Sequence, residues 1–189
     1  AGKVIYDKKT DFIKLITQAK FISQEERDRL TQSYKNEENK PIKMVLDFNE
    51  SGSYYTFESI NREIDEGSFS LMNKENIIKY DFENKTLQQS IYFLGKNYSV
   101  SDTLKPHNWK VLNELREISG YLCMKATAED SLKNEKITAW FSTDIGVSAG
   151  PDKFVGLPGL ILEIDINDGL VNYSINNIKL AETVALPNI

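Results

Sequence analysis

The sequence contains little of the material from which catalytic and metal sites are usually built. Its 189 residues include one histidine, His107, and one cysteine, Cys123, and a single cysteine cannot close an internal disulfide. A Cys–His nucleophile pair, or a metal site made from these two residues and a carboxylate, stays open as a hypothesis without a local motif. The P-loop, the GxGxxG fingerprint and the HExxH zinc motif are absent. We therefore expect no enzyme and no cofactor, and we assign no catalytic residue and no metal ligand.

The sequence also lacks a positive charge excess and a long apolar run. Its formal net charge is -5, so it offers no basic field to collect the phosphates of a nucleic acid or of an anionic membrane surface. No apolar stretch approaches the roughly 20 residues that a membrane-spanning helix needs. We expect no nucleic-acid partner and no transmembrane segment.

Length and composition are those of one folded domain. Hydrophobic residues make up 40% of the chain and charged residues 27%, which is ordinary for a globular protein. Splitting the chain would leave two small cores, so we predict a single domain over residues 1–189. The sequence begins AGKVIYD without an initiator methionine, which leads us to expect that a targeting peptide has been removed.

A strongly helical pattern lies near the N-terminus, over about residues 10–36. Apolar residues recur at helical spacing behind Thr10 and Asp11, which are both candidate N-caps. In the following segment SQEERDRLTQSY, Ser23 and Glu26 have the spacing of a capping box. Both predicted helices are amphipathic, so we expect them to pack on another layer of the protein.

From about residue 40 to residue 180, short segments rich in β-branched and aromatic residues alternate with Gly, Asn and Asp. Together with GKVIYD near the N-terminus, the predicted strands are IKMVLDF, SYYTFES, NIIKYDF, TLQQSIYFL, NYSV, WKVLNE, ISGYLCMKATA, KITAWFST, LILEIDI and LVNYSINNI. Most spacers are too short for a parallel crossover, so the sheet should be antiparallel. The predicted fold class is α+β, mainly antiparallel β, with a strongly curved sheet or open half-barrel partly covered by the small N-terminal helical segment.

The segment VGLPGLILEI, residues 155–164, places turn residues directly before an apolar strand. Pro158 and Gly159 occupy the positions that a type II turn favours, so we expect a positive φ at Gly159. Gly156 lets the backbone pass close to whatever lies beneath it. After the turn, apolar residues alternate along a strand with one buried face, and Asn167-Asp168-Gly169 predicts a hairpin turn.

This segment resembles the signature of the GLPGLI family, envelope proteins found mainly in Bacteroidota. Further matches to the family pattern extend the resemblance over about residues 40–180, whereas the helical segment at 11–36 is least matched. The matching residues are Trp109, Gly120, Tyr121, Cys123, Lys125, Ala126, Trp140, Gly150, Pro151, Phe154, Gly156, Leu157, Pro158, Gly159, Leu160 and Ile161. The resemblance implies a signal peptide, a periplasmic or secreted location and genes near outer-membrane transport receptors. It implies no known enzyme.

Two weaker resemblances point in the same direction. The pieces LPGLILEI, NDG and YSINNI are similar to the end of the LolA-like lipoprotein-carrier fold, which implies an open antiparallel half-barrel with helices in its mouth. The tripeptides Asp102-Thr103-Leu104 and Asp130-Ser131-Leu132 resemble the O-glycosylation acceptor pattern of exported Bacteroidota proteins. Both tripeptides fall in predicted loops, where a glycan could be accommodated.

Strand alternation decides how we interpret the cysteine. In the predicted strand ISGYLCMKATA, Cys123 shares a face with Tyr121 and Lys125, opposite Leu122 and Met124. If the latter face is core, the thiol lies on the other side of the sheet. We interpret Cys123 as a small, partly buried residue. An intermolecular disulfide or an attachment point is the alternative.

The many aromatic residues on the predicted strands suggest a function. A curved sheet lined with aromatic rings and covered by helices can hold an apolar ligand between the sheet and the helices, although ordinary core packing explains the same pattern. Our first hypothesis is an extracytoplasmic, non-enzymatic binding or carrier module for an apolar or peptide-like ligand. The alternative is a structural or accessory subunit of an outer-membrane transport or assembly complex, with an outer-membrane protein as partner. A hydrolase that uses Cys123 or a carboxylate pair ranks third.

Overall fold

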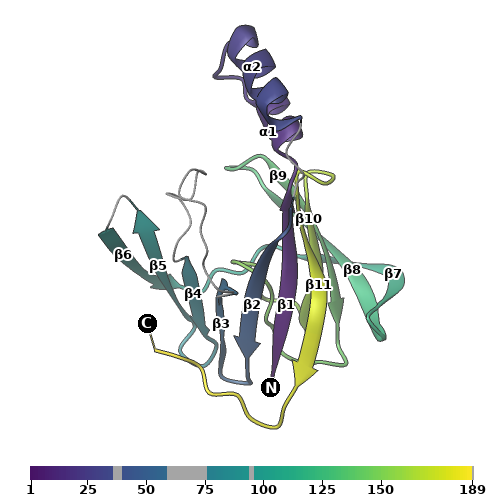
Figure 1. Cartoon of the computed structure of the whole chain (residues 1–189). Helices are drawn as coiled ribbons and strands as arrows, with labels where there is room; N and C mark the ends of the chain where they lie inside the picture. The colour runs from purple at the N-terminus through teal and green to yellow at the C-terminus, as the bar shows by residue number, and fades with distance from the viewer. Residues whose placement is uncertain (36–39, 59–75, 94–95, 189) are drawn as a thin grey trace.

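The computed structural model describes residues 1–35, 40–58, 76–93 and 96–188. Within these residues the chain forms two short helices and eleven strands (Figure 1). The helices are α1 (Phe12–Gln18) and α2 (Gln24–Tyr34). The strands are β1 (Gly2–Thr10), β2 (Ile42–Phe48), β3 (Gly52–Phe57), β4 (Ile77–Asp81), β5 (Thr86–Phe93), β6 (Lys96–Thr103), β7 (Lys110–Ile118), β8 (Tyr121–Asp130), β9 (Glu135–Ser142), β10 (Leu160–Ile166) and β11 (Val171–Leu180).

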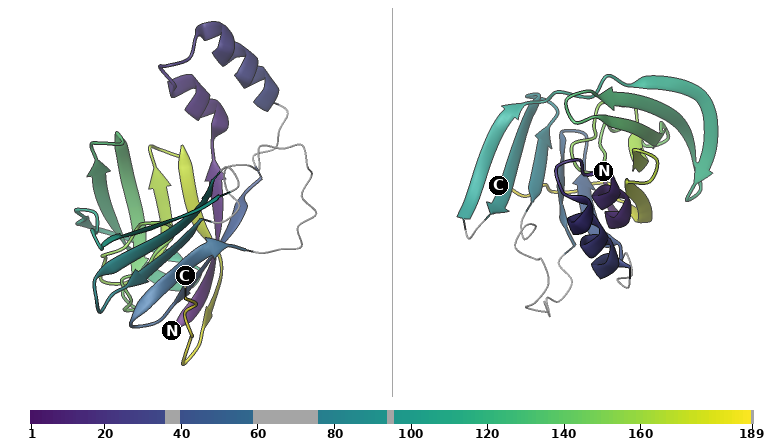
Figure 2. Two further views of the ribbon diagram at one scale, coloured as in Figure 1. Left: turned by 90° about the vertical axis from the view of Figure 1, so that its left-hand side faces the viewer. Right: turned by 90° about the horizontal axis from the view of Figure 1, so that it is seen from above.

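The strands make one antiparallel sheet in the order β6-β5-β4-β3-β2-β1-β11-β10-β9-β8-β7. Strands that follow one another in the sequence pair, except β6 and β7, and β1 joins the two halves because it pairs with both β2 and β11. The sheet curves into an open bowl whose edges, β6 and β7, do not meet (Figure 2). The predicted antiparallel, strongly curved sheet is therefore confirmed. The finer LolA-like resemblance stays a prediction.

The capping signals are confirmed, but the predicted covering of the sheet by the helices is wrong. The Asp11 side chain accepts a hydrogen bond from the Lys14 amide, and Ser23 forms a complete capping box with Glu26. The two helices pack on each other and extend past the end of β1 as a hairpin (Figure 1). The apolar face of α1 is largely exposed, with Leu15 46% accessible. The helices are not needed to cover the concave face of the sheet, because another segment of the chain covers it.

The segment ISGYLCMKATA, predicted as one strand, contains a hairpin turn. β7 continues to Ile118, and β8 starts at Tyr121 and pairs back against it. Ser119 and Gly120 connect the two strands with φ values of 51° and 82°. Two consecutive positive φ values are typical of the tight turn whose twist matches that of paired strands. The Ser119-Gly120 pair is therefore a turn signal that the strand prediction overlooked.

The hairpin after VGLPGLILEI is confirmed, with one irregularity. Asn167, Asp168 and Gly169 all have positive φ between β10 and β11. Along β10, the register against β9 shifts between Ile161 and Glu163. This bulge interrupts strict alternation, so that consecutive residues at the start of β10 are all buried.

Gly159 does not have a positive φ, so the predicted type II turn is wrong. The glycine is needed for space: a Cβ atom would collide with the Ser142 carbonyl oxygen and lie 2.6 Å from the carbonyl carbon. The positive φ occurs instead at Gly156, where it is 98° and where a Cβ atom would collide with Pro106. The close approach predicted for Gly156 is thus confirmed.

Replacing Gly159 with alanine should destabilise the protein by about 3 kcal/mol, because the new methyl group meets backbone that cannot rotate away. The matched control is Gly146→Ala, since a Cβ atom at Gly146 meets nothing within 4 Å. This variant should change stability by less than about 1 kcal/mol. Urea unfolding followed by tryptophan fluorescence measures both. Equal stabilities of the two variants would contradict the steric role of Gly159.

Candidate functional site

A long loop occupies the concave side of the sheet. Residues 143–159, which we call the plug, leave β9 and return to β10 inside the bowl (Figure 2). The buried apolar side chains of the plug join the main hydrophobic core, which includes residues from both halves of the sheet. They are Ile145, Ala149, Phe154, Val155 and Leu157. The centre of the bowl is therefore filled by the protein's own side chains.

Tyrosine hydroxyls from opposite halves of the sheet bind the plug. Tyr173 on β11 donates a hydrogen bond of 2.9 Å to the Asp152 carboxylate, and Tyr80 on β4 donates one of 3.4 Å to the Lys153 carbonyl oxygen. Burial, reinforced by the nearby Asp152 charge, raises the pKa of Tyr55, Tyr80 and Tyr173 well above the ordinary range. All three hydroxyls therefore stay protonated in the folded protein.

The start of β10 is fixed to the plug and to β1. Ile161 donates its amide hydrogen to the Ala149 carbonyl oxygen, at 2.9 Å. Its own carbonyl oxygen accepts a 2.6 Å hydrogen bond from the buried Tyr6 hydroxyl. Gly150 makes this approach possible, since a Cβ atom there would collide with the Phe154 carbonyl oxygen.

His107, the lone histidine, belongs to an aromatic cluster at the border of the plug. Its ring centroid lies 5.2 Å from that of Phe154 and 5.5 Å from that of Trp109. Trp109 also donates its indole hydrogen to the Val155 carbonyl oxygen at 2.9 Å. Burial lowers the pKa of His107, although the Asp130 charge acts in the opposite direction. Its buried Nδ1 atom has no hydrogen-bond partner among the described residues.

The motif residues fall into two groups in space. The first group forms the plug, its connection to β10 or a contact with it, and comprises Trp109, Gly150, Pro151, Phe154, Gly156, Leu157, Pro158, Gly159, Leu160 and Ile161. The second group lies on the β7–β8 turn and on strands β8 and β9, and comprises Gly120, Tyr121, Cys123, Lys125, Ala126 and Trp140. Their packing is structural, and a functional role for either group stays a prediction.

Part of the second group faces away from the plug. Trp140 lies under two cations, with the Arg116 guanidinium 4.3 Å and the Lys125 amine 5.9 Å from the ring centroid. Arg116 also forms a 2.7 Å ion pair with Glu163 on β10. These contacts link β7 to β10 across the outer face of the sheet. They contribute modestly because the charges remain partly exposed.

Cys123 and His107 do not form a pair. The charges that influence the Cys123 thiol come from Arg116, Asp144 and Glu163, whereas those around His107 come from Asp130, Lys133 and Asp152. Cys123 is fully buried, which is more than the partial burial we predicted, and burial raises its pKa to about 11. Within the described residues, no three His, Cys, Asp or Glu side chains are grouped to hold a metal ion.

An apolar groove adjoins the plug where the turn after β4 and the segment after β6 meet it. We call this the rim groove; its volume is about 410 Å³. It is lined by Phe82, Lys85, Leu104, Pro106, Ser148, Val155 and Gly156. The Lys85 amine forms no ion pair with a described residue. Val155 and Gly156 lie in the motif segment, but sequence reasoning gave no signal that the other five residues would meet them.

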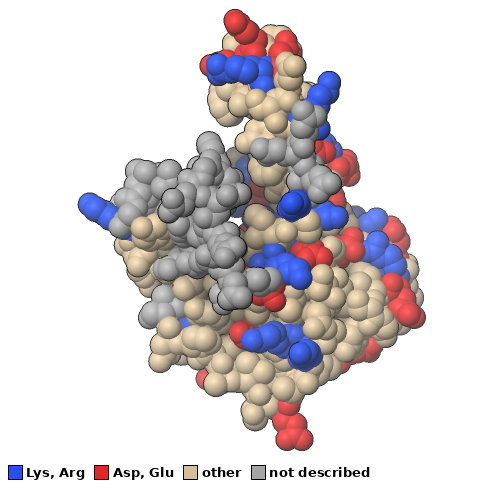
Figure 3. Space-filling model, viewed as in Figure 1, with Lys and Arg blue, Asp and Glu red and all other residues tan. Residues whose placement is uncertain are grey.

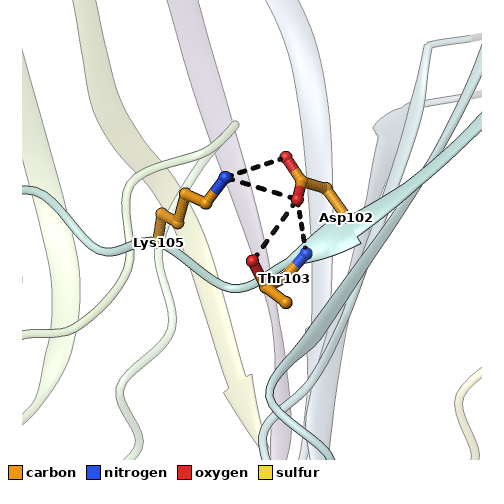
Figure 4. Close-up of polar contacts among 3 residues, drawn as sticks. All are labelled: Asp102, Thr103 and Lys105. Atoms are coloured by element: carbon orange, nitrogen blue, oxygen red, sulfur yellow. Dashed lines mark hydrogen bonds and ion pairs between the residues drawn. The ribbon is translucent and has the colours of Figure 1, made fainter.

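One of the acceptor-like tripeptides lies near this groove, at the end of β6. Asp102 and Thr103 are the last strand residues, so the prediction that the whole tripeptide lies in a loop is wrong. The Asp102 carboxylate accepts hydrogen bonds from the Thr103 amide at 2.7 Å and from its hydroxyl at 3.3 Å, and the Lys105 amine lies 3.4 Å away (Figure 4). The Thr103 amide and, secondarily, Lys105 lower the pKa of Asp102.

Comparison with known proteins supports the fold and a short motif. A family model described as "Protein of unknown function (Porph_ging)" matches residues 129–163, from the end of β8 through the plug into β10. This chain is similar to that family over the matched segment. The match includes the GLPGLI letters, but assignment to a GLPGLI family stays a prediction. No curated protein matches.

Among solved structures, PNGF-II resembles this chain in two crystal forms, P21 and C2. Each has a TM-score of 0.64 and 16% sequence identity, with 97% and 98% of this chain covered. The chain spans 29% of the length of PNGF-II. At this identity the likeness shows a shared fold. None of the described helices is long and apolar enough to cross a membrane.

Cys123 should not react with iodoacetamide at pH 8 in the folded protein. With a pKa of about 11, about one thiol in a thousand is ionised at that pH, and the thiol is also buried. Labelling should appear in 6 M urea and should be measured by mass spectrometry of the intact chain. Native labelling as fast as that of free glutathione would contradict this environment and would favour the thiol hydrolase hypothesis.

Stability should fall steeply as the pH rises above about 10. An unfolded tyrosine has a pKa near 10, whereas burial raises the pKa of folded Tyr6 and Tyr173 far above that value. The stability that these groups contribute is present below pH 10 and is lost as the unfolded state ionises. Tyr6→Phe should cost about 1–2 kcal/mol at pH 7, because the Ile161 carbonyl oxygen loses its partner, and should show a shallower alkaline decline.

The control for this prediction is Tyr98→Phe, since the Tyr98 side chain is half exposed. This variant should keep both the wild-type stability and the wild-type alkaline decline in urea midpoints measured from pH 8 to pH 11. An identical decline in Tyr6→Phe and wild type would show that the buried hydroxyl does not resist ionisation.

Proposed function

We propose that this chain is a non-enzymatic binding module of the cell envelope that binds an apolar side chain of a peptide-like ligand in the rim groove. The observation that carries the proposal is the juxtaposition of an apolar groove with the Lys85 amine at its border, which forms no ion pair with any residue that the structure describes. The resemblance of the motif segment to exported proteins supports a periplasmic or secreted location.

The filled bowl is our reason for proposing the rim groove rather than the centre of the sheet. The sequence suggested a ligand between the sheet and the helices, but the plug packs against the centre of the concave face and the helices stand beyond it. The rim groove remains open beside Val155 and Gly156. We therefore place the ligand at the border of the plug rather than beneath it.

The chemistry of the groove favours a peptide over a purely apolar ligand. Phe82, Leu104 and Pro106 supply apolar surface, and the groove volume of about 410 Å³ lies in the range of ligand sites. Lys85 has a φ of 53° in the turn between β4 and β5 and presents a cation at the same groove. A C-terminal apolar residue with a free carboxylate combines both features.

A second candidate function is that of an accessory subunit of an outer-membrane complex. Two surfaces favour it. β6 is an edge strand whose eight residues are all exposed, and edge strands can pair with a strand of another chain. The helical hairpin carries Phe21, which is 90% exposed. A protein partner would cover either surface.

Selection from a random heptapeptide library with free C-termini tests the first function. Leu104→Asn should weaken binding of the selected peptides at least tenfold, because it places an amide in the apolar groove. Lys85→Gln should weaken them severalfold, and amidating their C-termini should have the same effect. Fluorescence polarisation measures each dissociation constant.

The matched control is Leu132→Asn, because Leu132 is 98% exposed on the β8–β9 turn. This variant should bind as wild type does, and thermal unfolding verifies that both Leu→Asn variants are folded. Failure to select any peptide, or equal affinities for the Leu104 and Leu132 variants, would refute the rim groove as the site. Recovery of a stoichiometric protein partner through β6 would then support the second function.

A further inference from the structure

A second groove lies between the helical hairpin and the neighbouring turns of the sheet, and we call it the hairpin groove. Its volume is about 610 Å³, and it is lined by Lys14, Thr17, Gln18, Lys20, Arg27, Asn134, Lys136, Asn167 and Asp168. Four of these residues are cationic and one is acidic, although the whole chain has a formal net charge of -5. Lys and Arg side chains are visible on the hairpin and where it joins the sheet (Figure 3).

No carboxylate of the described residues forms an ion pair with the cations of the hairpin groove. The Lys14 amine donates to the backbone carbonyl oxygens of Asn167 and Asp168, at 2.9 and 2.6 Å. Arg27 donates to the Ala19 carbonyl oxygen at 2.8 Å. Carbonyl groups orient a cation and leave its net charge in place, so the groove keeps a positive potential.

The floor of this groove is held rigidly by hydrogen bonds between two turns. The Asn167 amide donates to the Lys136 carbonyl oxygen at 2.9 Å, and the Lys136 amide donates to the Asn167 side chain at 2.8 Å. The Asp11 amide, at the start of α1, donates to the Leu170 carbonyl oxygen at 2.9 Å. These bonds fix the position of the groove lining before any ligand binds, which lowers the cost of binding.

We propose that the hairpin groove binds a phosphate monoester. A phosphate monoester carries close to two negative charges at neutral pH and three oxygens that accept hydrogen bonds, so it can engage several cations at once. Among the described residues the amines of Lys20 and Lys136 have no hydrogen-bond or ion-pair partner, and they supply the direct contacts. Lys14 and Arg27 contribute to the positive potential of the groove, and the side-chain amides of Gln18 and Asn134 supply further hydrogen-bond donors. The single carboxylate, Asp168, leaves the lining with a net positive charge.

The same phosphate chemistry occurs in soluble compounds and in lipid head groups, so the experiment has two arms. In the first, calorimetry in low-salt buffer measures binding of glycerol phosphate and of inorganic phosphate. In the second, sedimentation measures binding to phosphatidylcholine vesicles with and without phosphatidic acid. Low salt is needed because exposed charges are screened at higher ionic strength. The full chain is used in both arms.

The test variant is Lys20→Gln/Lys136→Gln, which removes these two amines and breaks no side-chain hydrogen bond between described residues. The matched control is Lys110→Gln/Lys179→Gln, which removes the same charge from exposed positions on β7 and β11 outside the groove. We expect the test variant to bind phosphate at least tenfold more weakly and the control to stay within twofold of wild type. Thermal unfolding without ligand should give equal midpoints, whereas phosphate should raise the midpoints of wild type and control.

Each outcome bears on the proposal directly. Binding of glycerol phosphate that the test variant loses supports a soluble ligand. Binding confined to vesicles with phosphatidic acid, again lost in the test variant, supports a lipid phosphate. Absence of binding in both arms, or equal weakening in the test variant and the control, overturns the proposal.

Discussion

The hydrogen bonds of buried tyrosines are the constraint on which the rest of this structure depends. An open sheet with a concave apolar face must cover that face, and here an irregular loop does so. Such a loop brings backbone carbonyl groups into the core, where an unpaired carbonyl is costly. Tyr80 satisfies one of these groups, at Lys153, and Tyr173 binds the Asp152 side chain. Tyr6 does the same for the carbonyl oxygen of Ile161 at the start of β10, where the loop rejoins the sheet. An aromatic ring with a polar tip suits this position because it fills the core and still donates a hydrogen bond.

The filled bowl moves the candidate ligand sites to the two ends of the strands. Strand pairing places Gly2 opposite Phe48 and Gly52 opposite Asp81, so the β4–β5 turn and its rim groove lie at the end where β1 begins. Thr10 pairs with Val171 at the other end, where the helical hairpin and its groove lie. Turns and chain connections at these ends can vary in side chain without disturbing the core between them. The two grooves differ accordingly, one apolar with a single cation and the other polar with four.

The sequence patterns predicted the sheet well because strand formation is a local property. Alternating apolar residues and turn residues identified nearly every strand, and the capping box at Ser23 was read correctly. The main wrong predictions concern contacts between segments that are distant in the sequence. Gly159 is required because the Ser142 backbone lies too close for a Cβ atom, and not because its φ is positive. The sequence alone does not distinguish these two uses of glycine. We expected the helices to cover the sheet because no sequence pattern in residues 143–159 predicts that this loop fills the concave face. The full burial of Cys123 likewise depends on what covers its strand.

The motif that resembles a known family forms the scaffold of the protein more than it forms the two candidate binding grooves. The matched segment, residues 129–163, contains the plug with β9 and part of β10. It contributes Ser148, Val155 and Gly156 to the rim groove, while Phe82, Lys85 and Leu104 come from outside it. It contributes Asn134 and Lys136 to the hairpin groove, while Lys14 and Lys20 lie outside. Proteins that share the motif can therefore share the filled bowl and still differ in ligand, because part of the lining of each groove, including Lys85 and Lys20, comes from segments the motif does not specify.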